Sequence, residues 1–325
     1  MTAPATCAGV DPDVHVRVYA ARLSQQEPIM SQTETTALAQ GRPSTTALMM
    51  AIARAVHQLL DEPIVLPDPV ALPILGPELE RAVRDDPYRY NDPMARPMRA
   101  AVVARAMVAD AELAEASRAG VRQCVVLGAG LDTLAWRVPA TDDGMRVFEV
   151  DHPATQAWKQ DLMRQAALSL PDWAKSVSAD LQHASLQGVL EEAGFRGDRP
   201  ACFVWLGVTP YLTDSAIEAT LRHVASLPPG TRIVFDYRVD AGVLPSFERV
   251  MAAHMAEQVA ALGEPWLSAF VPEQLVQRLT AMGFGSVTDL DAPALNARYF
   301  PRRKDGLQTA GGGLRVLCAR VGEGR

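Results

Sequence analysis

The segment from Val125 to Thr133 constrains the fold more than any other, because a short apolar run there meets two glycines and then polar residues. Such a run is typical of a buried strand ending in a tight turn, and glycine lets a ligand approach the backbone closely. A dinucleotide site would have a third glycine where this chain has Thr133. Asp151 ends a second apolar run about 20 residues later, where a carboxylate can accept both ribose hydroxyls. The pattern predicts a site for an adenosyl ligand without a pyrophosphate.

Seven apolar segments after residue 120 indicate strands, and helical patterns separate most of them. This alternation predicts an α/β fold with a Rossmann-like, mainly parallel sheet. The last two segments flank a long loop that contains Tyr299 and a glycine run, so they are expected to add an antiparallel strand at one edge. The expected strands are 122–127, 146–150, 175–179, 201–206, 231–237, 284–290 and 314–320.

The chain is expected to hold a flexible arm over 1–40 and a single domain over 41–325. Within that domain, Ser44 precedes an amphipathic helix, and a second helix is predicted over 98–116. The predicted parts are N-terminal helices over 41–120, a cofactor-binding core over 121–239, lid helices over 240–281 and C-terminal strands over 282–325.

Composition and charge exclude several classes of function. The net charge is −7 and the pI is near 5.4, with arginines scattered among acids, so nucleic acid is not an expected partner. No run reaches the roughly 18 apolar residues of a membrane span, and the four cysteines lack zinc-site spacing, so no metal is expected. We expect a cytoplasmic protein; the sequence does not fix the oligomeric state and allows a homodimer.

Polar residues or glycines follow the first four expected strands, at the sheet edge where ligands bind in open α/β folds. Glu149 and Asp151 share one side of a strand, so one is expected to reach the ligand and the other to bind backbone or arginine. We assign Asp151 to the ribose. Asp180 either caps a helix beginning near Gln182 or accepts a hydrogen bond from the adenine amine. The residues at these strand ends are Gly128, Ala129, Gly130, Asp151, Asp180, Leu181, Leu206 and Gly207.

Three motifs carry a resemblance to a known family: VLGAGLDTLAWR over 126–137, FEVDHP over 148–153 and WLGVTPYL over 205–212. Together they resemble the leucine carboxyl methyltransferase family of S-adenosylmethionine-dependent enzymes, especially its bacterial branch. The similarity extends from about Pro43 to the C-terminal strand. It implies a class I methyltransferase fold with extra N-terminal helices and a cap over the active site.

The resemblance also implies roles for individual residues. Gly128 and Gly130 would bind the methionine portion of the cofactor, Asp151 the ribose, and Asp180 with Leu181 the adenine end. An N-terminal arginine would bind the cofactor carboxylate, since a guanidinium offers two parallel hydrogen bonds.

Two positions need a choice. Arg105 is preferred as that arginine because its spacing to Asp110 matches bacterial relatives, and Arg99 is the second candidate. Family members often carry glutamate where this chain has Leu206, so the backbone of Leu206 and Gly207 would have to make the contacts there.

The methyl acceptor is harder to predict. His152 is expected to have a turn role or a contact near the adenosine rather than a catalytic one. Tyr211 either lines the substrate pocket or packs under the lid. The late segment Arg298–Tyr299–Phe300 combines a cation with an aromatic wall, which suits an anionic or aromatic substrate, or else packs against the cap.

The sequence therefore predicts an S-adenosylmethionine-dependent O-methyltransferase acting on a carboxylate or hydroxyl of a small metabolite, with natural-product biosynthesis as one setting. A carboxylate is slightly preferred, because no convincing general base is visible. One alternative is a nicotinamide-dependent oxidoreductase on a similar sheet, which Thr133 argues against. Another is a methyltransferase-like scaffold without activity, which Leu206 suggests.

Overall fold

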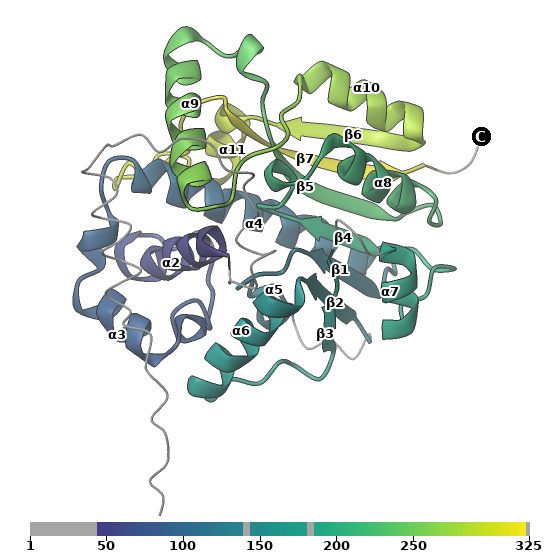
Figure 1. Cartoon of the computed structure of the whole chain (residues 1–325), viewed down its shortest axis with the longest axis horizontal. Helices are drawn as coiled ribbons and strands as arrows, with labels where there is room; N and C mark the ends of the chain where they lie inside the picture. The colour runs from purple at the N-terminus through teal and green to yellow at the C-terminus, as the bar shows by residue number, and fades with distance from the viewer. Residues whose placement is uncertain (1–43, 139–143, 181–184, 323–325) are drawn as a thin grey trace, which may run out of the picture.

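A computed structural model describes residues 44–138, 144–180 and 185–322, so the predicted arm over 1–40 lies outside the described residues. Its centre is a seven-stranded sheet flanked by helices (Figure 1). The strands are β1 Gln123–Leu127, β2 Arg146–Asp151, β3 Ala174–Ser178, β4 Cys202–Trp205, β5 Arg232–Arg238, β6 Phe284–Leu290 and β7 Leu314–Val321.

The strand order is β3-β2-β1-β4-β5-β7-β6. Strands β1 to β5 pair in parallel, and β7 runs antiparallel between β5 and β6. The predicted mainly parallel sheet with an antiparallel C-terminal strand is therefore confirmed, and each strand lies within one residue of its expected bounds. The order reverses between β1 and β4, which places a ligand-binding switch point beside the glycine turn.

Alternate strand residues feed two hydrophobic cores on opposite faces of the sheet. In β1, Val125 and Leu127 point into one core, and Cys124 and Val126 into the other. The first core is covered by α7 Leu186–Ala193, α8 Asp214–Ala225 and α10 Pro272–Met282. The second is covered by α4 Ala95–Arg118 and α11 Ala292–Tyr299, which lie behind the sheet in Figure 1. Burial on both faces explains why the strands are near-continuous apolar runs.

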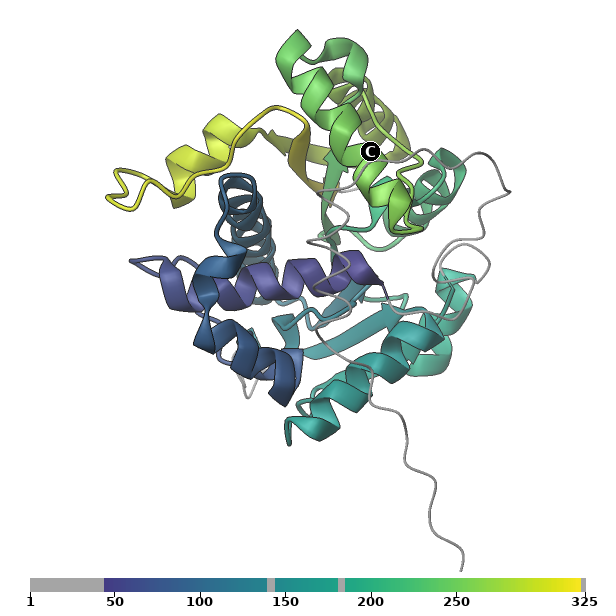
Figure 2. The same cartoon turned by 60° about the vertical axis from the view of Figure 1, so that its left-hand side comes forward.

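The N-terminal helices form a third layer against α4 and α6, with a small core of their own. Helix α2 begins after Ser44, whose hydroxyl accepts a hydrogen bond from the Ala47 backbone nitrogen, so the predicted cap is confirmed. Figure 2 shows α2 lying alongside α3. The elements of this part and the short remaining helices are α2 Thr45–Leu60, η1 Pro73–Leu75, α3 Pro77–Asp85, η2 Pro87–Tyr90, α5 Leu134–Arg137, α6 Pro153–Gln165, η3 Thr209–Tyr211 and η4 Ala241–Val243.

The predicted lid segment divides into two unlike helices. Helix α10 packs against β6 and α8, and it buries Leu275 and Leu279 completely in the first core. It is therefore part of the sheet's cover, and a lid is the wrong prediction for it. Helix α9, Ser246–Ala261, buries none of its residues and stands at the margin of the fold (Figure 1). A lid role stays a prediction for α9 alone.

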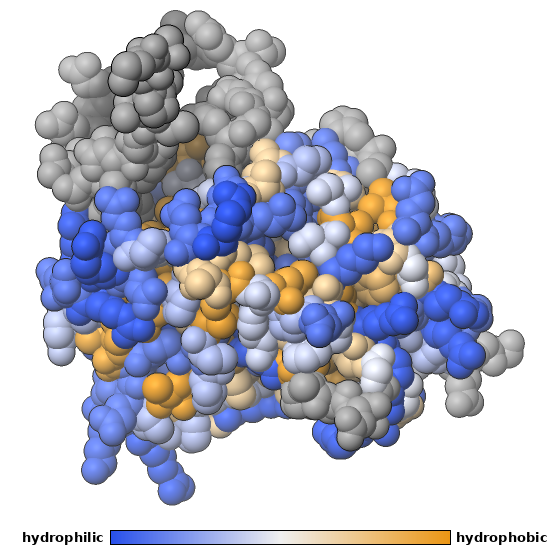
Figure 3. All heavy atoms as spheres, turned by 90° about the horizontal axis from the view of Figure 1, so that it is seen from below, coloured by the Kyte–Doolittle hydropathy of each residue, from blue (hydrophilic) through white to orange (hydrophobic). Residues whose placement is uncertain are grey.

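Within the described residues, no helix is long and apolar enough to cross a membrane. On the face seen in Figure 3, hydrophobic residues form small groups separated by hydrophilic ones. Scattered apolar residues of this kind are normal on a protein surface.

Candidate active site

The glycine turn after β1 is held to β2 by the backbone. The Gly128 and Ala129 nitrogens both donate to the Val150 carbonyl oxygen, at 2.8 and 3.1 Å. Gly128 and Gly130 have φ values of +65° and +47°, a region that side chains other than glycine rarely adopt. The backbone of the turn therefore favours glycine at both positions.

Two side chains that the sequence did not flag lie over these glycines. A Cβ atom on Gly128 would lie 2.3 Å from Cγ2 of Val208, and one on Gly130 would lie 3.2 Å from the Cβ atom of Ala47. Val208 follows β4, and Ala47 is in the first turn of α2. The N-terminus of α2 and the end of β4 therefore meet at the glycine turn.

Asp151 lies at the end of β2 with its carboxylate against this turn. Its two oxygens accept hydrogen bonds from the backbone nitrogens of Gly130 and of His152. Burial raises the pKa of Asp151, although both hydrogen bonds favour the ionised form. Each oxygen keeps a lone pair for a further donor, so the carboxylate fits a ribose diol. His152 caps α6 by accepting from the Ala154 nitrogen through Nδ1, so the predicted turn role is confirmed.

Glu149, on the same side of β2, has a different partner from the one expected. Its Oε2 atom lies 2.7 Å from Nζ of Lys159 on α6, and both side chains are buried. Lys159 also donates to the Asp132 carbonyl oxygen at 2.8 Å. Burial raises the pKa of Glu149, and the ammonium of Lys159 opposes that shift. The pair links α6 to the glycine turn and leaves Asp151 as the carboxylate open to a ligand.

Arg105 lies at the switch point but already has an acidic partner. Its Nη1 donates to Oδ2 of Asp236 at 2.6 Å, while the Gly207 nitrogen donates to Oδ1 of the same carboxylate at 2.6 Å. A Cβ atom on Gly207 would lie 2.9 Å from Nη2 of Arg105. Asp236 thus joins Arg105 and Gly207, the two residues here that were predicted to touch the cofactor. The sequence analysis missed Asp236, although its position as an acid near the end of the apolar strand β5 could have indicated it. The partly buried side chain of Leu206 packs against the second core.

The structure does not place Arg99 at the turn. Its guanidinium is buried, and it donates to Asp61 at 2.7 and 2.9 Å and to Asn91 at 2.9 Å. Arg99 therefore ties α4 to the far end of α2, because a buried guanidinium needs a carboxylate partner. Asp180 follows β3, but Ser185 rather than Asp180 caps the next described helix. Leu181 lies outside the described residues.

The late aromatic segment is not a loop at the site. Arg298 and Tyr299 are in the last turn of α11, which packs against α4 and the outer strand β6. Phe300 is buried in the second core, and exposed Arg298 lies over the Tyr299 ring at 5.4 Å. The predicted substrate contact is wrong for Phe300, because the helix turns it into the core; Arg298 is exposed and Tyr299 half-buried, and a substrate contact stays a prediction for these two residues.

Tyr211, by contrast, is the last residue of η3 and follows by three positions Val208, whose side chain lies against Gly128 of the glycine turn. The loop after α9 packs against η3: the Leu267 nitrogen donates to the Pro210 carbonyl oxygen at 2.6 Å, and the Ser268 hydroxyl donates to the Thr209 carbonyl oxygen at 2.8 Å. The carboxylate of Glu264 joins that loop to the N-terminus of α2, accepting from the backbone nitrogen of Thr45 at 2.6 Å and from the hydroxyl of Ser44 at 3.2 Å. These contacts join three short segments, which we call the roof of the site: residues 44–47 at the start of α2, 209–211 of η3 and 264–268 of the loop after α9.

A buried charged network that the sequence analysis missed supports the other side of the turn. Thr133 donates through Oγ1 to Asp68 and accepts from Arg137 at 2.6 Å. Arg54 of α2 donates to the Leu131 carbonyl oxygen and lies 3.8 Å from Asp68. Arg54 lies among the apolar residues of α2, and this position in the sequence could have indicated a buried ion pair. Thr133, which stands where a dinucleotide site would have its third glycine, therefore holds the turn in place through its side-chain hydrogen bonds.

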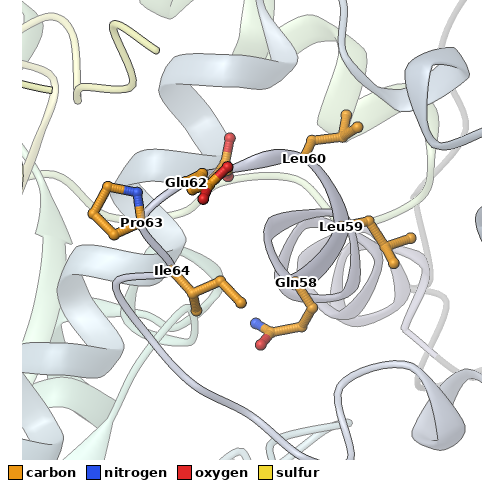
Figure 4. A pocket seen from close by; sticks show the side chains of 7 residues that line it. Gln58, Leu59, Leu60, Glu62, Pro63 and Ile64 are labelled. Carbon is orange, nitrogen blue, oxygen red and sulfur yellow. The ribbon is translucent and has the colours of Figure 1, made fainter. Parts of the chain in front are cut away.

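Two cavities were found elsewhere. One of about 450 Å³ is lined by residues 58–64, at the end of α2 and in the loop after it (Figure 4). The other, of about 320 Å³, lies between α7 and α8. Neither is lined by the glycine turn. The described residues contain no group of three or more histidine, cysteine or acidic side chains placed to hold a metal.

The sheet order, the glycine turn and the carboxylate at the end of β2 define a class I S-adenosylmethionine-dependent methyltransferase. A sequence model of the leucine carboxyl methyltransferase family matches residues 47–225. The chain belongs to this family, and its cofactor is S-adenosylmethionine.

Relatives and solved structures agree. The chain is 30% identical over 285 residues to "Putative S-adenosyl-L-methionine-dependent methyltransferase YktD" of Bacillus subtilis, covering 81% of this chain and 93% of that protein. A relative of the same description in Mycolicibacterium smegmatis is 31% identical, covering 68% and 73%. The crystal structure of a "putative methyltransferase" from Thermobifida fusca has a TM-score of 0.53 at 19% identity, covering 87% and 96%, which shows a shared fold.

Proposed function

We propose that this methyltransferase acts on oxygen, transferring a methyl group to a carboxylate, or else a hydroxyl, of a small metabolite such as a natural-product intermediate. The bound cofactor supplies an electrophilic methyl group on a sulfonium. The chain's own residues bind, orient and exclude water, and orientation alone can contribute about 7 to 11 kcal/mol. Asp151 and the glycine turn would hold the cofactor, with Arg105 near its carboxylate.

The observation that favours a carboxylate acceptor is the state of the ionisable groups at the site. Burial raises the pKa of Tyr211, so its hydroxyl stays protonated at neutral pH and donates rather than accepts a proton. His152 uses Nδ1 to cap α6. A phenol with a pKa near 10 costs about 4 kcal/mol to deprotonate at pH 7, whereas a carboxylic acid is already ionised.

Calorimetry with S-adenosylhomocysteine tests the cofactor site. Replacing Asp151 by alanine or asparagine should weaken binding at least about tenfold, because the ribose hydroxyls lose a charged acceptor. Asp161→Ala is the matched control, since this aspartate is exposed on α6 and pairs with exposed Arg164 on the same helix. Equal affinity in all three proteins would refute the site.

A product assay tests the acceptor. Mass spectrometry of mixtures containing matched acids, phenols and amines should show methyl esters first. Transfer to amines alone would contradict oxygen methylation, and cofactor binding without any product across the panel would favour the inactive scaffold. A nicotinamide-dependent oxidoreductase is no longer a useful alternative, because the chain matches a methyltransferase family and Thr133 occupies the position of the third glycine of a dinucleotide site.

A further inference from the structure

Arg238, at the carboxyl end of β5, differs from the other arginines of the protein's interior. Its guanidinium carbon lies 3.9 Å from the centre of the Trp266 ring, and the side chain is half-buried. Within the described residues it makes no ion pair with a carboxylate. Asp240, two residues along the chain, accepts a hydrogen bond from the Gly242 nitrogen at 2.8 Å and caps η4. The interior arginines Arg54, Arg99, Arg105, Arg137 and Arg232 all lie against carboxylates.

This unpaired cation belongs to the roof of the site. Trp266, on which it stacks, lies two residues after Glu264, whose carboxylate accepts hydrogen bonds from the backbone nitrogen and the hydroxyl of Thr46. The next residue, Ala47, is the one that lies against Gly130 of the glycine turn. A set of contacts and short chain links therefore runs from Arg238 to the turn, on the β4–β5 side of the switch point.

The stacking also sets what Arg238 can bind. One face of the guanidinium is covered by the indole ring, which leaves the N–H groups along its edge for a planar, bidentate anion. Burial lowers the pKa of Arg238, so the surroundings disfavour an unpaired charge there. A half-buried cation of this kind is stabilised when an anion arrives.

We propose that Arg238, held against Trp266, binds a carboxylate of the methyl acceptor, so that the natural substrates are small organic acids. This inference rests on the proposed methyltransferase function and names its substrate class. Arg238 would be a specificity residue, because an uncharged analogue would leave the guanidinium desolvated and unpaired.

The test measures binding to the protein saturated with S-adenosylhomocysteine. The probes are benzoate, phenylacetate and hexanoate, each compared with its amide by titration calorimetry. At least one acid should bind about tenfold or more tightly than its amide. Arg238→Gln should abolish that preference, Arg238→Lys should keep part of it, and Arg249→Gln, an exposed arginine on α9, should keep all of it.

The outcomes separate the two levels of the proposal. If the wild-type protein does not bind S-adenosylhomocysteine, the proposed function fails. If every variant binds it equally but Arg238→Gln keeps the preference for acids, Arg238 is not the anion site. The inference is also overturned if the wild-type complex prefers no acid over its amide.

Discussion

The two sides of the switch point are built differently. On the β1–β2 side, buried charges are paired: Glu149 with Lys159, and Arg137 with Asp110 at 2.9 Å. On the β4–β5 side, Arg105 pairs with Asp236, but Arg238 stacks on Trp266 and has no carboxylate partner among the described residues. On the first side the Asp151 carboxylate, held by two backbone nitrogens, remains to accept from a ligand, as expected for a cofactor that the whole family binds. On the second side the guanidinium of Arg238 is left without a carboxylate, as expected where the methyl acceptor varies between family members.

The largest predicted effect is on stability, and it contrasts Lys159, which pairs with Glu149, with Arg238, which has no carboxylate partner among the described residues. Lys159→Met should lower the free energy of unfolding by about 3 to 5 kcal/mol, because it leaves Glu149 buried without a partner. Arg238→Met should cost less than about 1 kcal/mol, since no buried carboxylate loses its partner. Urea denaturation measures both. The double variant Lys159→Met with Glu149→Gln should recover part of the loss, and equal losses in the two single variants would remove the contrast.

The next prediction concerns apolar side chains. Leu127, at the end of β1, is fully buried, so Leu127→Ala should cost about 2 to 5 kcal/mol through lost transfer energy and a cavity. Phe247 on α9 is 76% exposed, and Phe247→Ala should change stability by no more than about 0.5 kcal/mol. Thermal unfolding of the two variants, with the cofactor product absent, provides the comparison. A large loss for Phe247→Ala would mean that α9 packs against a surface in solution.

The smallest predicted effect is on pH dependence. Because burial raises the folded pKa of Asp151 above 3.8, the folded state holds this proton more tightly than the unfolded chain does. Its contribution to stability therefore falls as pH rises from about 3.8 through the raised value. Affinity for S-adenosylhomocysteine should rise over the same interval, since the ribose needs the ionised acceptor.

Denaturation and calorimetry as a function of pH measure both trends. Asp151→Asn should flatten them. Arg238→Gln should leave them in place, because a guanidinium does not titrate in this range. A pH slope that survives in Asp151→Asn would assign it to another group.

Much of the architecture could be predicted from local patterns. Strand bounds followed from apolar runs flanked by glycine and acids, and the Ser44 cap followed from its position before an amphipathic segment. The lid and the late aromatic loop could not be predicted, because α10 and α11 are short helices whose burial depends on strands distant in sequence. Periodicity alone did not distinguish Leu279 of α10, which is buried, from Val250 of α9, which is exposed.

The sequence by itself determined the glycine turn, the carboxylate after β2 and the family, because these depend on residues close together along the chain. Only the tertiary structure decided which arginine is committed to which acid, since Asp236 and Arg105 are 131 residues apart. It also decided that Val208 and Ala47 meet over the turn and that Arg238 faces Trp266 rather than a carboxylate. Burial makes charge pairing compulsory, and burial is a property of the folded chain rather than of any segment.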